Sequence, residues 1–400
     1  MVLKYSRPAR RRLAVVTAGV LALGAVMSGP GAASDAVRLP PPPRPLAAAE
    51  AAPEPSASAP GGVAGPPSRS GSASTAFGAY LNYGADGVAR MKDLSSWLGG
   101  AELRVGHTYL PGDLWSNIEG PPGFLDTWAK WRRDKKDRLF VLNVPMMDQY
   151  NARLSNAMVR RLMARAASGE FDRHFHTLAK RLVDLGVPDT IIVLGWEMNG
   201  ITYTHRCNAD PERWKVYWRR IVTAMRSVPG QQFKFDFAPS RGMDAIPWPE
   251  CYPGDDVVDI IGMDSYDNPQ GQSFDEEVSE PYGLRHQVDF AARHGKEISY
   301  PEWGLFRNGD NVKYMLRMLA WIDEHKPLYQ TITDYCPHGV WACSANPRAA
   351  ALYRLVMADQ QGASTDRSPT PAPSPAAGPV GPSPTPARRR GRRGACPHRP

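Results

Sequence analysis

The sequence predicts an α/β protein with a (β/α)8 TIM barrel, and two observations carry this prediction. Eight short apolar runs of strand length recur along the middle of the 400-residue chain, and segments with helical periodicity separate them. Strands that alternate with helices favour a parallel sheet covered on both faces. Eight such units favour a closed barrel over an open doubly wound sheet, and no Gly-x-Gly-x-x-Gly loop typical of that sheet follows any run.

The apolar runs predict strands at residues 77–83, 102–106, 139–144, 190–195, 233–238, 258–263, 297–300 and 330–333. In a barrel of this kind, catalytic and ligand-binding groups stand at the carboxyl ends of the strands. Polar residues directly after these runs are therefore the first candidates for a functional site.

Three of the expected helices have clear sequence signals. Residues 171–185 place apolar side chains three and four apart, and we expect His174 on this helix to be solvated. Asp210 followed by Pro211 is typical of a capped helix start. Another helix is expected to face the core with Leu154, Met158 and Leu162.

All eleven tryptophans fall between Trp97 and Trp341, which confines the folded core to residues 76–360, one domain of barrel length. Residues 35–75 are rich in Pro, Ala, Gly and Ser, and residues 361–400 are rich in Pro, Ser and Arg. Such compositions bury too little apolar surface to fold, so we expect an extended linker and a disordered basic tail.

Residues 1–34 predict a signal peptide. Basic residues up to Arg12 precede an apolar run, residues 13–27, which is short for a membrane span and is followed by small residues suited to cleavage. We therefore expect a secreted protein with no membrane span after cleavage, and an uncleaved anchor is the alternative. Residues 10–12, all Arg, fit twin-arginine export and an ordinary basic leader equally, so the export route stays open.

The net charge of +8 comes from the flanks of the chain. Residues 76–360 carry 33 Lys or Arg against 36 Asp or Glu, so the core is mildly acidic. A nucleic-acid partner, which a basic core would favour, is therefore not expected. The arginines of residues 388–393 predict either a solvated tail or contact with an anionic cell wall.

In an exported protein the cysteines are expected to form disulfides. The core holds Cys207, Cys251, Cys336 and Cys343, which permit three pairings, and Cys396 lies in the tail as a spare thiol. We favour Cys207–Cys251 and Cys336–Cys343, because each pair would tie neighbouring loops or close one loop. A zinc site is disfavoured, since the chain has no Cys-x2-Cys, and we expect neither metal nor cofactor.

Two glutamates stand at the ends of expected strands. Glu197 follows the run 190–195, and Glu302 follows the run 297–300, so both open onto one barrel mouth. Glycosidic cleavage needs two carboxyl groups that flank the bond, about 5–5.5 Å apart for retention of configuration. One must be protonated and the other ionised, and neighbouring charge with partial burial pushes their pKa values apart. The pair therefore predicts hydrolysis of a glycosidic bond.

These motifs resemble glycoside hydrolase family 26. The residues 195–200 (Gly-Trp-Glu-Met-Asn-Gly) and 301–304 (Pro-Glu-Trp-Gly) are similar to the acid/base and nucleophile signatures of that family of retaining barrel enzymes. The resemblance implies that Glu197 is the acid/base and Glu302 the nucleophile. Residues 258–266 resemble the motif whose tyrosine, here Tyr266, hydrogen-bonds the nucleophile.

The resemblance implies a substrate among β-mannan, β-xylan, β-glucan and related exopolysaccharides. Family mannanases usually carry His directly before the acid/base, whereas this chain has Trp196, so the sugar, its linkage and endo or exo action stay open. An oligosaccharide or polysaccharide partner and a monomeric state are expected. A catalytically silent carbohydrate-binding barrel is the alternative function, and a structural domain without a ligand would leave the paired glutamates unexplained.

Further site residues are predicted around the two glutamates. Arg104 and His107, near the end of the second strand, are expected to hold sugar hydroxyls or orient Glu302, with plain loop hydrogen bonding as the alternative. Asn199 is expected to position Glu197 or contact substrate. Tryptophan offers a large aromatic face to sugar rings, and core packing is the alternative; these candidates are Trp196, Trp303 and Trp341.

Overall fold

The computed structural model describes residues 75–365, and side chains as far as residue 358. The expected signal peptide, nearly all of the expected linker and tail, and Cys396 lie outside the described residues. Among the described residues, no helix is both long enough and apolar enough to cross a membrane.

Within residues 75–365 one parallel sheet of nine strands closes on itself, in the order β6-β5-β4-β3-β2-β1-β9-β8-β7, with β6 also paired to β8. Eight of these strands form the barrel, and the two-residue β7 pairs with the end of β8. The strands are β1 Ala76–Tyr80, β2 Val105–Tyr109, β3 Leu139–Val144, β4 Ile191–Leu194, β5 Lys234–Phe237, β6 Ile260–Gly262, β7 Ser265–Tyr266, β8 Glu297–Gly304 and β9 Tyr329–Thr333. The predicted (β/α)8 barrel is confirmed.

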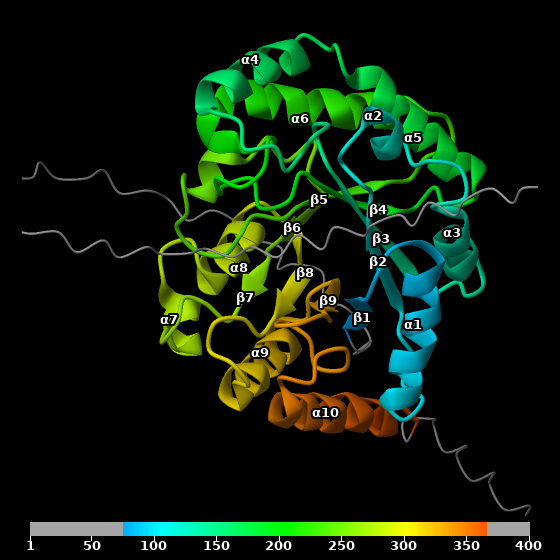
Figure 1. Cartoon of the computed structure of the whole chain (residues 1–400), viewed down its shortest axis with the longest axis vertical. Helices are drawn as coiled ribbons and strands as arrows, with labels where there is room; N and C mark the ends of the chain where they lie inside the picture. Colours follow the sequence, from blue (N-terminus) through cyan, green and yellow to red (C-terminus); the bar gives the residue numbers. More distant parts are fainter. Residues whose placement is uncertain (1–74, 366–400) are drawn as a thin grey trace, which may run out of the picture. The chain divides into compact units, whose positions relative to one another are not determined.

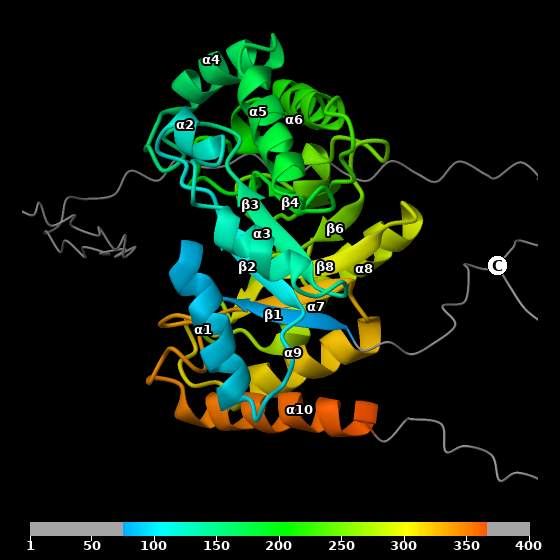
Figure 2. The same cartoon turned by 90° about the vertical axis from the view of Figure 1, so that its right-hand side faces the viewer.

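Helices connect the eight barrel strands, except that only a 3-10 turn lies between β5 and β6, and β7 follows β6 without a helix. Figures 1 and 2 show α4, α5 and α6 together on one side of the barrel, and α9 and α10 on the opposite side. The elements are α1 Gly84–Trp97, α2 Trp115–Ile118, α3 Asp126–Arg133, α4 Asn156–Ala167, α5 Asp172–Asp184, η1 Cys207–Ala209, α6 Pro211–Arg226, η2 Trp248–Cys251, α7 Phe274–Ser279, α8 Leu284–Arg293, α9 Val312–His325 and α10 Pro347–Thr365.

Two strands differ from their predicted bounds in ways that matter for the site. The second strand begins at Val105, three residues after the predicted start, and continues to Tyr109 through the buried polar residues His107 and Thr108. The seventh barrel strand, β8, continues to Gly304 and so includes Glu302. His107 and Glu302, which the sequence pattern placed after strands, are therefore part of them, whereas Glu197 lies beyond the end of β4.

The helix predictions are right in position and partly wrong in orientation. The side chain of Asp210 accepts the Arg213 N–H and caps α6 as predicted. In α4 the predicted inward residue Met158 is exposed, whereas Val159, Met163 and Ala166 are buried. The N-cap residue of α4 sets this phase, because the Ser155 hydroxyl accepts the Met158 N–H.

His174 was predicted to be solvated, and this prediction is wrong. The residue is buried, its Nδ1 lies 2.7 Å from the Glu119 carboxylate, and its ring stacks on Trp115 with centroids 4.4 Å apart. The Glu119 carboxylate, which follows the end of α2, therefore satisfies an imidazole that helical spacing alone predicts to be exposed.

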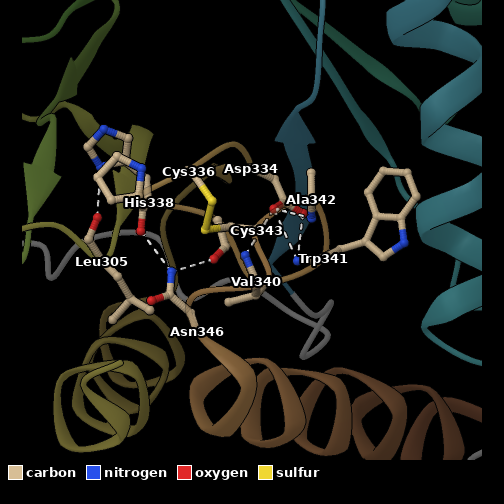
Figure 3. The surroundings of a disulfide bond; sticks show 11 residues. Leu305, Asp334, Cys336, His338, Val340, Trp341, Ala342, Cys343 and Asn346 are labelled. Carbon is tan, nitrogen blue, oxygen red and sulfur yellow. Dashed lines mark hydrogen bonds between the residues drawn. A yellow bond between two sulfur atoms is a disulfide. The ribbon is translucent and has the colours of Figure 1, made fainter. Parts of the chain in front are cut away.

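The expected disulfides, Cys207–Cys251 and Cys336–Cys343, are both present. The second closes the loop between β9 and α10 (Figure 3). The carboxylate of Asp334 accepts backbone N–H groups of residues 340–342 inside this loop. His338 Nδ1 lies 2.7 Å from the Leu305 carbonyl oxygen, which fastens the loop to the end of β8.

Candidate active site

Glu197 and Glu302 occupy neighbouring places at the carboxyl ends of the barrel strands. Glu302 is part of β8 and only 7% exposed, and Glu197 follows the end of β4 closely and is mostly buried. The charge of Glu302 raises the pKa of Glu197, which requires the two carboxyl groups to be near each other in a poorly solvated region. The structure thus brings together the two glutamates that the sequence pairs.

Hydrogen-bond donors surround the carboxyl group of Glu302. The Tyr266 hydroxyl donates to Oε2 over 2.7 Å, and the Asn143 amide donates to Oε1 over 3.2 Å. Burial raises the pKa of Glu302, while hydrogen bonds from Tyr109, Tyr266 and Asn143 lower it. These donors favour the ionised carboxylate and partly oppose the effect of burial.

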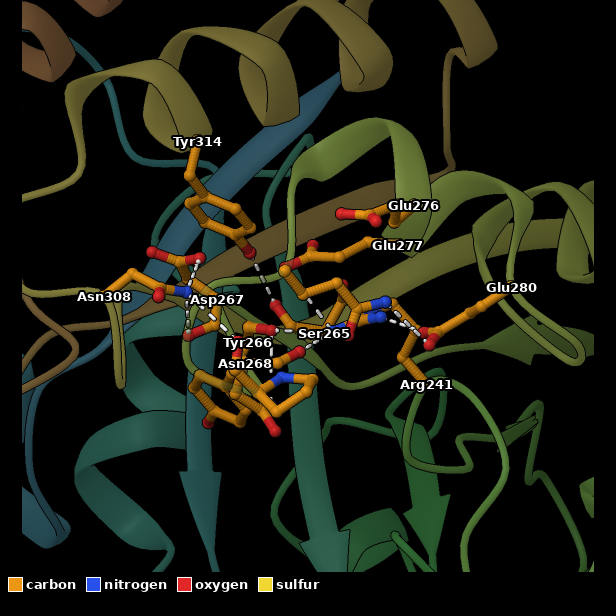
Figure 4. A network of polar contacts seen from close by, with 12 residues as sticks. Arg241, Ser265, Tyr266, Asp267, Asn268, Glu276, Glu277, Glu280, Asn308 and Tyr314 are labelled. Carbon is orange, nitrogen blue, oxygen red and sulfur yellow. Dashed lines mark hydrogen bonds and ion pairs between the residues drawn. The ribbon is translucent and has the colours of Figure 1, made fainter.

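A buried arginine fixes the backbone at Tyr266 and just after it (Figure 4). Arg241 donates to the carbonyl oxygens of Tyr266, over 3.1 Å, and of Asn268. Its guanidinium pairs with Glu280 and lies 3.5 Å from Glu277. Burial raises the pKa of Glu277 to about 8, although the charge of Arg241 lowers it.

The chain reaches Glu197 through a tight turn. Gly195 has φ +57° and Glu197 has φ +49°, a left-handed conformation that is costly for a residue with a side chain. A Cβ on Gly195 would lie 2.4 Å from the sulfur of Met146, so glycine is required there. The Glu197 N–H donates to the Ala238 carbonyl over 2.9 Å, which ties the turn to the end of β5.

Glu197 holds its proton more tightly than an exposed glutamate does. Burial, then the charge of Glu302, raises the pKa of Glu197 to about 7. Hydrogen bonds from Ser240 and Tyr203 lower this pKa but do not cancel the effect of burial. Glu197 is therefore substantially protonated at neutral pH, as a general acid must be.

The predicted residue Asn199 acts on Glu197 indirectly. Its side chain is buried, donates to the Ser240 carbonyl over 3.0 Å and accepts the Ser240 N–H over 2.9 Å. The two bonds fix Ser240, whose side chain hydrogen-bonds Glu197.

His107 does not contact Glu302 directly, and the side chain of Asn143 lies between them. Its Nε2 is 2.8 Å from the amide oxygen of Asn143, and its Nδ1 is 3.0 Å from the Thr331 hydroxyl. Burial lowers the pKa of His107 to about 4, so the ring is neutral at neutral pH. Because an amide oxygen only accepts, Nε2 carries the proton, and His107 orients the Asn143 amide that donates to Glu302.

Other predicted contacts are placed elsewhere. Arg104 precedes β2, at the opposite end of the barrel, and pairs with Asp137 at 3.2 Å. Trp303 is fully buried and donates to Gln330 over 2.7 Å. The Trp341 side chain points away from its loop toward α1, where Arg90 lies 5.0 Å from the ring centre (Figure 3).

The alternation of side chains along a strand explains the place of Trp303. Consecutive residues point to opposite faces, so a strand that presents Glu302 to the barrel interior presents Trp303 to the surrounding helices. Trp303 accordingly packs beside Tyr353 of α10, with ring centres 6.2 Å apart.

The structure adds a third buried carboxyl group to the site, Asp264. Burial raises its pKa well above the ordinary value, and the charges of Glu302 and Glu197 raise it further. Like charges at close range disfavour the simultaneous ionisation of all three carboxyl groups. The arrangement therefore favours a protonated carboxyl group beside an ionised one.

Sequence reasoning missed the partners Asn143, Tyr109, Tyr203, Ser240 and Asp264. A signal existed for Asn143, since it is the one polar residue in the strand sequence Leu-Phe-Val-Leu-Asn-Val. The tyrosines carried no local signal, because only the closure of the barrel directs them to the glutamates. Among the described residues, no group of three or more His, Cys, Asp or Glu side chains is arranged to hold a metal ion.

Comparison with known protein families finds a match to part of the chain. The model of glycosyl hydrolase family 26 matches residues 158–300, a segment that contains Glu197 and Tyr266 and ends just before Glu302. None of the curated proteins matches the chain in sequence.

Several solved structures share the fold. The catalytic domain of the Bacillus sp. JAMB-750 GH26 endo-beta-1,4-mannanase is 16% identical, with a TM-score of 0.53 over 72% of this chain and 86% of that chain. GH26C from Muricauda sp. MAR_2010_75 is 18% identical, with a TM-score of 0.54 over 71% and 85%. Bacillus subtilis mannanase man26 is 17% identical, with a TM-score of 0.51 over 70% and 84%. The family match over residues 158–300, within this shared fold, confirms the resemblance to glycosyl hydrolase family 26 that the motifs predict.

Proposed function

We propose that the protein is a secreted endo-acting hydrolase of a β-linked polysaccharide, which works with retention of configuration. The observation that carries this proposal is the contrast between the two glutamates. Tyr266 and Asn143 donate to Glu302 and favour its ionised form, whereas burial and the neighbouring charge raise the pKa of Glu197 to about 7.

The contrast assigns the chemical roles. Glu197 protonates the glycosidic oxygen while the carboxylate of Glu302 attacks the anomeric carbon, which breaks the C–O bond and forms a glycosyl ester on Glu302. The ionised Glu197 then takes a proton from water, and the resulting hydroxide displaces Glu302 and releases the sugar. Both glutamates return to their starting protonation states.

The hydrogen-bond donors of Glu302 act in both steps. As the ester forms, negative charge leaves the carboxylate, and it returns when the ester is hydrolysed. Thr333 holds the Tyr266 hydroxyl and His107 holds the Asn143 amide, so neither donor has to rearrange when the ester forms or when it is hydrolysed. Donors fixed in this way are electrostatically preorganised.

Exposed tyrosines near the glutamates are proposed to meet the sugar rings. Tyr83 and Tyr335 are 45% and 47% exposed, and both contact Tyr80 edge-on, at 5.8 and 6.1 Å. Burial, followed by the charge of Glu302, raises the pKa of Tyr335, so this ring lies close to the carboxylate. Tyrosine faces of this kind stack on the C–H faces of sugars.

The family resemblance and the mannanases among the similar solved structures make mannan one candidate substrate. Because Trp196 stands directly before Glu197, where family mannanases usually carry His, β-xylan, β-glucan and exopolysaccharide are equal candidates. Two disulfides in the barrel support secretion, because such bonds persist in oxidising compartments.

A panel of glycans tests the proposal. The purified chain is incubated with β-mannan, β-xylans, β-glucans and bacterial exopolysaccharides, and the size and initial anomeric form of the products are recorded. We expect internal cleavage of at least one β-glycan, with the β-anomer formed first. No cleavage of any glycan, or products that first appear as the α-anomer, would contradict it.

A further inference from the structure

We propose that Trp196 is a positioning residue: its indole N–H fixes the direction in which the Tyr203 hydroxyl donates, toward the carboxyl group of Glu197. This inference rests on the proposed role of Glu197 as the acid/base. It reassigns Trp196, which the sequence places among the residues that contact substrate.

Trp196 is enclosed by other rings rather than open to a ligand. Its side chain is 3% exposed, and its ring centre lies 5.4 Å from Tyr109, 5.9 Å from Tyr150 and 5.2 Å from Tyr203. The carbonyl oxygen of Trp196 is also engaged, since His205 Nε2 lies 3.1 Å away. A sugar ring has no face of this indole to stack on.

The direction of the hydrogen bond follows from the chemistry of the indole. Its N–H can donate but cannot accept, and it lies 3.1 Å from the hydroxyl oxygen of Tyr203. The Tyr203 oxygen therefore accepts from Trp196, and its own hydrogen remains to be donated. The partner for that hydrogen is the side chain of Glu197, to which Tyr203 is hydrogen-bonded.

The ring of Tyr203 has little freedom to take its hydroxyl elsewhere. Tyr150 stacks on it with ring centres 5.8 Å apart and planes 14° apart, and His205 stacks at 4.9 Å and 20°. His205 is itself fixed, because its carbonyl accepts the indole N–H of buried Trp214 over 2.6 Å.

This arrangement matters when Glu197 changes its protonation state. Once Glu197 has given its proton to the leaving group, its carboxylate receives the Tyr203 hydrogen bond, which lowers the pKa of Glu197 against the effect of burial. Trp196 keeps that donor aimed at the carboxylate in both half-reactions, and no atom of Trp196 touches the reacting bond.

The test removes the donor and keeps the ring. Trp196→Phe and Tyr203→Phe are compared singly and together, with Trp196→Leu as a second variant without an N–H. Trp321→Phe is the matched control, because it removes a similar Trp–Tyr hydrogen bond, 2.6 Å to the Tyr300 hydroxyl, away from both glutamates.

Two measurements report on Glu197. One is the alkaline limb of kcat/KM against pH on the glycan that the panel identifies. The other is a 13C NMR titration of labelled glutamate carboxyl groups, with Glu197→Gln for assignment, which needs no activity. If the wild-type chain cleaves nothing, the proposed function fails while the titration still tests Trp196.

We expect Trp196→Phe, Trp196→Leu and Tyr203→Phe each to raise the pKa of Glu197 by roughly one unit, with little change in KM. The double variant Trp196→Phe/Tyr203→Phe should shift no further than Tyr203→Phe, since both act through one hydrogen bond. Trp321→Phe should leave the titration unchanged. Additive shifts in the double variant, no shift on loss of the indole, or an equal shift in Trp321→Phe would overturn the inference.

Discussion

The hydroxyl of Tyr266 donates to Oε2 of Glu302 over 2.7 Å. The same hydroxyl lies 2.8 Å from Thr333 Oγ1, and Arg241 holds the backbone carbonyl of Tyr266 from the other side. Tyr266, the donor to the nucleophile, is therefore held both at its hydroxyl group and at its backbone carbonyl. Such fixation keeps the carboxylate of Glu302 available in a largely buried site.

Replacing Tyr266 by Phe removes this donor without removing the ring. The pKa of Glu302 should rise, because burial then acts with less opposition. Since Glu302 must be ionised to attack, the acid limb of kcat/KM should move to higher pH, and activity at neutral pH should fall roughly 10- to 100-fold. Tyr252→Phe, which removes a hydroxyl bonded to Asp255, serves as the control, and an unmoved acid limb in Tyr266→Phe would refute the role of Tyr266.

The alkaline side of the pH profile belongs to Glu197. Because its pKa is raised to about 7, kcat/KM should decline as the pH rises through that value and Glu197 loses its proton. Glu197→Gln should abolish this limb and should slow most the substrates with poor leaving groups, which depend on the acid. Equal slowing of activated aryl glycosides and natural glycan by Glu197→Gln would speak against acid catalysis.

Glu277, paired with Arg241, predicts a dependence of stability on pH. Its folded-state pKa of about 8 exceeds that of an unfolded glutamate, so its contribution to stability is full below about pH 4.5 and is lost as the pH rises through 8. The slope from this one group approaches about 1.4 kcal/mol per pH unit within that window. Urea unfolding between pH 4.5 and 8.5 should show a shallower decline for Glu277→Gln than for wild type, and identical slopes would contradict the assignment.

The two disulfides should differ in their effect on stability. Cys207–Cys251 spans 44 residues and Cys336–Cys343 spans 7. Loop-closure entropy then predicts losses of about 4 and about 2.5 kcal/mol on removal of each bond. Paired Cys→Ser variants compared by urea unfolding measure the difference, and a larger loss for the short loop would contradict the entropic prediction and point instead to the hydrogen bond between His338 and the Leu305 carbonyl.

The barrel could be predicted because its strands are apolar on both faces and its helices carry local signals. Asp210 caps α6 through its own carboxylate, a bond between near neighbours in sequence. In α4, by contrast, two apolar sets share nearly the same spacing, one with Met158 and the other with Val159 and Met163. Only the Ser155 cap and the packing against α6 select the second set.

The glutamates could be predicted for a similar reason, since each directly follows an apolar run. Their partners could not, because they come from other strands and meet only when the barrel closes. The error at Arg104 came from the register of one strand. The buried polar residues His107 and Thr108 extend β2 beyond its apolar run, and this leaves Arg104 at the far end.

The rate of Glu302→Ala on the identified glycan tests whether Glu302 is the nucleophile. A nucleophilic Glu302 predicts a fall of at least about 1000-fold in kcat for a variant that unfolds at the same temperature as wild type within a few degrees. It also predicts that added azide restores turnover and gives the α-glycosyl azide, because the small anion attacks from the side that Glu302 occupies. Hydrolysis by Glu302→Ala at a rate near that of wild type would contradict it.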